Sequence, residues 1–64
     1  MTDYAGMTVN ERLVVAGLMQ AFDKAVMARD RAGAIAVLRQ VNLSDAQAAA
    51  TTDTVFANPS RYGY

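Results

Sequence analysis

The sequence contains no cysteine and no histidine, and these two absences remove most of the common chemistry of protein sites. Without cysteine, the chain has no disulfide and no thiol nucleophile. Without either residue, a metal ion would have only oxygen ligands, and the commonest general acid and base is missing. The glycines are isolated, so no glycine-rich phosphate loop is present. We therefore expect no enzyme activity, no catalytic residue, no metal or cofactor site and no small-molecule ligand.

An excess of charge of either sign is also absent. Six Lys and Arg residues balance six Asp and Glu residues, so the formal net charge at pH 7 is zero. No overall field would steer the protein toward nucleic acid or an anionic membrane. The longest apolar stretch, Val9 to Ala28, is interrupted by polar residues and is too broken to span a membrane. The first seven residues include an acidic residue and no basic one, unlike the start of a signal peptide. We expect a cytoplasmic protein with no membrane contact, for which nucleic acid is not the expected partner.

What the chain does have is helical periodicity with clear capping signals. Thr8 and Glu11 have the spacing of a capping box, and Ser44 and Gln47 repeat it. Asp30 is a good N-cap for a helix between them. These signals predict an all-α fold, a compact three-helix domain with a short aromatic C-terminal tail after Pro59. The predicted helices cover about 9–28, 31–41 and 45–58, in a single domain of residues 8–64 that follows a flexible extension of residues 1–7.

Apolar residues that recur at three- and four-residue steps define the face of each helix that we expect to be buried. In the first helix they are Val15, Leu18, Met19, Phe22, Ala25 and Val26. In the second they are Ala34, Ile35, Val37, Leu38 and Val41. In the third they are Ala48, Ala49, Thr52, Val55 and Phe56.

Some apolar residues of the first helix lie outside its expected buried face: Leu13, Ala16 and Met27, with Gly17 beside them. A domain of about 60 residues buries only about 60% of the surface that its unfolded chain exposes, so its stability is marginal. Self-association is a common remedy in such small domains. We therefore expect Leu13, Ala16, Gly17 and Met27 to contact a second copy, in a homodimer, or another protein.

The tail offers a second candidate interface in Tyr62 and Tyr64, because aromatic residues are enriched in interface hot spots. The alternative is that Tyr62 folds back over the seam between the first and third helices and completes a core that has few large residues.

Two further functions remain open. The second and third helices could form a helix-turn-helix of a DNA-associated regulator, although the third helix carries Asp45 and Asp53 and no basic residue. The protein could also be a small inhibitor or adaptor that occupies a partner's surface.

Several segments resemble a group of short uncharacterised bacterial proteins. These are Asn10-Glu-Arg-Leu-Val-Val-Ala-Gly-Leu18, the pair Phe22-Asp23, Val41-Asn-Leu-Ser-Asp-Ala-Gln-Ala48 and Ala57-Asn-Pro-Ser-Arg-Tyr-Gly-Tyr64. Proteins of that group begin with an Asn-Glu-Arg-Leu type segment and end with Asn-Pro-x-x-Tyr-Gly and an aromatic residue. The resemblance implies a bacterial cytoplasmic setting and carries no activity with it.

Overall fold

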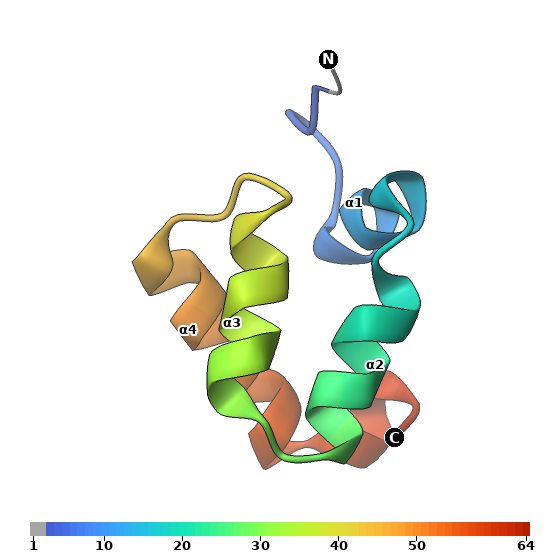
Figure 1. Cartoon of the computed structure of the whole chain (residues 1–64), viewed down its shortest axis with the longest axis vertical. Helices are drawn as coiled ribbons and strands as arrows, with labels where there is room; N and C mark the ends of the chain where they lie inside the picture. The colour runs from blue at the N-terminus through green and yellow to red at the C-terminus, as the bar shows by residue number, and fades with distance from the viewer. Residues whose placement is uncertain (1–2) are drawn as a thin grey trace.

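The computed structural model describes residues 3–64, and within this range the chain is helical with no strand. Its elements are α1 (Val9–Ala16), α2 (Met19–Met27), α3 (Arg31–Arg39), α4 (Asp45–Ala57) and the 3-10 helix η1 (Pro59–Tyr62). α3 packs against both α2 and α4, while α1 adjoins the first turn of α2 (Figure 1). The all-α prediction is confirmed, but the described residues form four α-helices and not three.

The additional helix arises because the predicted helix 9–28 breaks at Gly17. Gly17 has a φ of 71°, the left-handed conformation that commonly ends a helix. The N–H of Leu18 donates to the carbonyl of Leu13 at 2.9 Å, and that of Gly17 donates to Val14 at 3.1 Å. These bonds close the last turn of α1 and send the chain into α2 in a new direction.

The predicted caps are confirmed. Both capping boxes form, with Thr8 and Glu11 at the start of α1 and Ser44 and Gln47 at the start of α4. The side chain of Asp30 accepts a hydrogen bond from the N–H of Gly33 and caps α3. α4 ends within one residue of its predicted boundary, whereas α3 ends at Arg39, two residues before the predicted position.

The core contains the buried apolar residues Leu13, Phe22, Ala25, Val26, Ala34, Val37, Leu38, Val41, Leu43, Ala48 and Val55. The buried faces predicted for residues 31–41 and 45–58 are largely confirmed, with Thr52 buried and Ile35 and Phe56 partly buried. The face predicted for the first helix is wrong at Val15, whose exposed fraction is 55%. The break at Gly17 explains this error, since the helical phase of α2 does not continue into α1.

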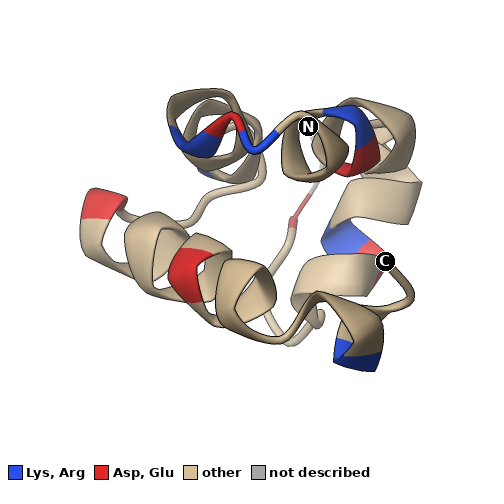
Figure 2. Ribbon diagram, turned by 90° about the horizontal axis from the view of Figure 1, so that it is seen from below, with Lys and Arg blue, Asp and Glu red and all other residues tan. Residues whose placement is uncertain are grey.

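Charged side chains join α3 to α4. Arg31 and Asp53 form an ion pair of 2.8 Å, and Arg39 and Asp45 form another of 2.8 Å. Figure 2 shows acidic and basic residues interspersed over the molecule. Both pairs are solvent-exposed, so they help to orient α4 on α3 more than they stabilise the fold.

The predicted flexible extension covers residues 1–7. Residues 1–2 lie outside the described residues, whereas Tyr4 is partly buried and packs against the core. Arg12 holds the end of this segment, because its Nε donates to the carbonyl of Met7 and its Nη1 to that of Val41. Among residues 3–64, no helix is long and apolar enough to cross a bilayer.

Candidate functional site

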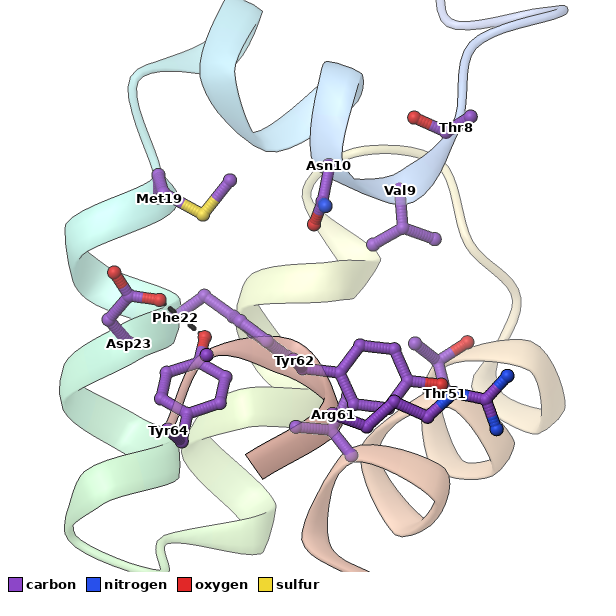
Figure 3. A pocket seen from close by; sticks show the side chains of 12 residues that line it. Thr8, Val9, Asn10, Met19, Phe22, Asp23, Thr51, Arg61, Tyr62 and Tyr64 are labelled. Atoms are coloured by element: carbon purple, nitrogen blue, oxygen red, sulfur yellow. Dashed lines mark hydrogen bonds between the residues drawn. The ribbon is translucent and has the colours of Figure 1, made fainter. Parts of the chain in front are cut away.

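A groove of about 750 Å³ lies between α1, α2, α4 and the C-terminal tail (Figure 3). Val9, Met19, Phe22 and Val55 supply apolar side chains to its wall. The remaining lining residues are Thr8, Asn10, Asp23, Thr51, Arg61, Tyr62, Gly63 and Tyr64. The volume lies in the range of ligand sites in proteins, and the lining combines apolar and aromatic side chains with polar and charged groups.

The tail forms one wall of the groove because it turns back toward α2. Pro59 occupies the start of η1, where its fixed φ is well suited, and Gly63 adopts a left-handed φ of 88°. The turn at Gly63 brings Tyr64 to α2, where the Tyr64 hydroxyl donates a hydrogen bond to Oδ1 of Asp23 (Figure 3). Desolvation raises the pKa of Tyr64, and the hydrogen bond to the Asp23 carboxylate raises it further.

The two candidate tyrosines therefore have different positions. Tyr64 is partly buried and packs against the core. Tyr62 remains 44% exposed, and its ring stands between the groove and a shallower hollow of about 260 Å³ that is lined by Ala50 and Thr54 of α4. The positions of the two tyrosines do not show whether they contact a partner, so their role at an interface stays a prediction.

The four residues of the first predicted helix that we expected at an interface, Leu13, Ala16, Gly17 and Met27, do not form one surface. Leu13 is fully buried, and the prediction that it is available to a partner is wrong for the folded chain. Ala16 is partly buried, Gly17 is exposed at the break, and Met27 is 71% exposed at the far end of α2. The direction change at Gly17 separates Met27 from the residues of α1.

The large apolar residues that α1 does expose are Val14 and Val15, with exposed fractions of 65% and 55%. Sequence reasoning missed both residues as surface candidates. A glycine that directly follows an apolar run is a known C-terminal signal, and Gly17 could have indicated that the helix ends there. With that boundary, the buried position of α1 falls on Leu13 and the two valines face outward.

Within residues 3–64, no group of three or more acidic side chains lies close enough together to hold a metal ion. The chain was compared with protein-family models, with curated proteins and with solved structures, and none of the three comparisons found a match. The groove, the exposed apolar residues and the charged side chains are therefore the features of the described residues that bear on function.

Proposed function

We propose that this protein is a small, non-enzymatic helical interaction protein that self-associates through α1. The observation that carries the proposal is the exposure of two adjacent large apolar residues, Val14 and Val15, on one short helix. The same surface would serve if the chain is an accessory subunit of a larger assembly. A bacterial, cytoplasmic setting belongs to the same proposal.

The packing of α1 supports this proposal. Of its eight residues, all of which are described, Leu13 alone is buried. Helices shorter than about 12 residues are marginal in water unless tertiary contacts stabilise them. A partner that covered Val14 and Val15 would contribute about 2 kcal/mol for each valine that becomes fully buried. A second copy would therefore stabilise the most weakly anchored helix of the fold.

The charge of the molecule favours a second copy as the partner. A large net charge keeps proteins apart, and this chain has a formal net charge of zero at pH 7. Ala16 and Gly17 follow the two valines and are small enough for the backbone of a second α1 to approach closely. A symmetric dimer would bury the same residues of both copies.

Sedimentation velocity of the wild type and two lysine variants tests the proposal. We expect the wild type to sediment as a dimer in the micromolar range and Val15→Lys to sediment as a folded monomer. Ala36→Lys is the matched control, because Ala36 is an exposed residue of α3 on another part of the surface. A monomeric wild type, or a Val15→Lys protein that remains dimeric, would contradict self-association through α1.

The DNA-associated regulator receives less support from the arrangement of charges. α4, the helix that would enter the major groove, carries Asp45 and Asp53 and no Lys or Arg. Both acids are paired with arginines of α3, which gives these charges a structural role. Their negative charge opposes contact with phosphates. The adaptor hypothesis remains compatible with the exposed valines, and a monomeric wild type would favour it.

A further inference from the structure

We propose that the groove between α1, α2, α4 and the tail binds a small organic cation, an amine that carries an apolar or aromatic body. This inference goes beyond self-association, because it uses the lining of the groove and not the exposed Val14 and Val15. It follows from the size of the groove, the aromatic side chains around it and the position of one carboxylate.

The lining suits an apolar body. Phe22 is buried beneath the groove, Met19 and Val9 are partly buried at its side, and the tail adds Tyr62 and Tyr64. Figure 3 shows these side chains gathered around one space. Aromatic rings also attract cations through their negative faces, so the same wall that accepts an apolar body favours an attached ammonium group.

Asp23 supplies the complementary charge. Its side chain is partly buried on α2, at the end of the groove beside Tyr64. The Tyr64 hydroxyl bonds Oδ1, and within residues 3–64 no hydrogen bond to Oδ2 is present. The bond to Tyr64 fixes the carboxylate in place, and Oδ2 remains able to accept a hydrogen bond from an ammonium group. A charge-assisted bond of this kind is about twice as strong as a neutral one.

The other charged residue of the groove favours the same orientation. Arg61 is exposed, and its guanidinium lies toward Thr51, away from the Asp23 end (Figure 3). Lys24 follows Asp23 in α2 but is exposed and does not line the groove. The ammonium group is therefore placed at Asp23 and the apolar body between Phe22 and Tyr62. An anionic group in place of the amine would lie against the Asp23 carboxylate and be repelled.

Three probes of nearly equal size test this assignment on the full chain: 2-phenylethylamine, 2-phenylethanol and 3-phenylpropionate. Each is titrated into ¹⁵N-labelled protein, and amide shifts are followed by NMR. We expect saturable shifts at Phe22, Asp23 and Tyr64 with the amine, and an affinity at least about tenfold lower for the alcohol and the acid, since loss of one charge-assisted hydrogen bond has that effect. Equal binding of amine and acid, or no saturable shift with the amine, would overturn the proposal.

Two variants assign the effect to Asp23. Asp23→Asn should lower the affinity for the amine by about tenfold and abolish its advantage over the alcohol. Asp45→Asn is the matched control, because Asp45 is an exposed carboxylate on α4 that does not line the groove, and it should bind the amine as the wild type does. If Asp23→Asn and Asp45→Asn lowered the affinity for the amine equally, Asp23 would not bind the ammonium group. The same would follow if the wild type bound the amine no more tightly than the alcohol.

Discussion

At the scale of single residues, Thr52 is the clearest departure from a well-satisfied core. Its side chain is fully buried on α4, and its hydroxyl has no hydrogen-bond partner among the described residues. A buried hydroxyl without a partner loses its bonds to water and gains none in return. Thr52→Val keeps the shape and removes this penalty, so we expect it to raise the free energy of unfolding by about 1 kcal/mol.

Chemical denaturation with urea measures this gain. Thr54→Val is the matched control on the same helix, because the Thr54 hydroxyl is exposed and donates to the carbonyl of Ala50 at 2.9 Å. We expect no increase in stability for Thr54→Val. A Thr52→Val protein that is less stable than the wild type would mean that the Thr52 hydroxyl has a partner in solution.

The hydrogen bond from Tyr64 to Asp23 makes a second prediction at the residue scale. Tyr64→Phe should lower the free energy of unfolding at neutral pH by about 1 kcal/mol, because the carboxylate loses its donor. The pKa of Tyr64 is raised in the folded protein, so the folded state resists ionisation of the phenol. The contribution of Tyr64 is therefore present below pH 10, the ordinary phenol value, and is lost as the pH rises beyond it.

Thermal unfolding measured below and above pH 10 tests whether the stability contribution of Tyr64 is lost at alkaline pH. The wild type should lose stability more steeply with rising pH than Tyr64→Phe, which has no proton to release at this position. Tyr62→Phe is the control, because Tyr62 is 44% exposed and its hydroxyl makes no hydrogen bond within residues 3–64. If Tyr64→Phe and the wild type respond alike to alkaline pH, the hydrogen bond to Asp23 does not persist in solution.

At the scale of the helices, Gly17 decides that the chain has two short helices in place of one long one. Its φ of 71° strains any residue with a Cβ, while the space around it is open, so a side chain would meet no neighbour. Gly17→Ala should therefore lower the free energy of unfolding by about 1 kcal/mol through backbone strain alone. Asn tolerates the left-handed conformation better, and Gly17→Asn should recover part of this loss. Equal stability of Gly17→Ala and the wild type in urea denaturation would show that α1 and α2 can join without cost.

The two capping boxes provide an internal comparison of charge. The N–H of Thr8 donates to the Glu11 carboxylate, and this backbone bond, with the side-chain bond to Thr8, lowers the pKa of Glu11. A lowered pKa gives stability that is present above the unfolded pKa and is lost as the pH falls through the folded pKa. Gln47 makes the same bond to Ser44 without a titrating group.

We therefore expect Glu11→Gln to keep the cap and to flatten the loss of stability at acid pH. The reciprocal change, Gln47→Glu, should make that loss steeper. Circular dichroism melts from neutral pH down through the carboxyl range measure both effects. Asp53, whose pKa is lowered by its bond to Arg31, contributes in the same direction in all of these proteins and so cancels from the comparison. If the wild type and Glu11→Gln lost stability equally as the pH falls, the proposed contribution of the Glu11 charge would be contradicted.

The sequence predicted helix starts better than helix directions. Thr8, Asp30 and Ser44 marked starts correctly because the capping bonds are local and each depends on residues three positions apart. The break at Gly17 was missed, because periodicity continued across it and glycine within a helix is tolerated. That one error changed the predicted surface, since it placed Leu13 outside and Val15 inside.

The groove could not be predicted for a related reason. It requires α1, α2, α4 and the tail to meet, and the hydrogen bond that closes it joins residues 41 positions apart in the chain. No signal in the sequence singled out Asp23, and Tyr64 was indicated only as a candidate interface residue of the tail. Only the turns at Pro59 and Gly63 bring the two together, and these turns indicate a change of direction without indicating its target.

At the scale of the whole molecule, the proposed self-association predicts that stability depends on protein concentration. The core of this short chain contains few large side chains, and Val14 and Val15 remain outside it. A partner that binds only the folded state raises its stability by mass action, so the melting temperature of the wild type should rise as the protein is concentrated. Val15→Lys should remove this dependence, while Ala36→Lys, on the exposed side of α3, should retain it.

Differential scanning calorimetry over a range of concentrations separates this effect from a change in the monomer. If Val15→Lys merely destabilised α1, its melting temperature would be lower than that of the wild type at every concentration by a similar amount. If the valines lie at a dimer interface, the two proteins should converge on dilution and diverge on concentration, because only the wild type gains from association. A melting temperature of the wild type that does not change with concentration would contradict self-association through α1, and Val14 and Val15 would then remain exposed in the free protein.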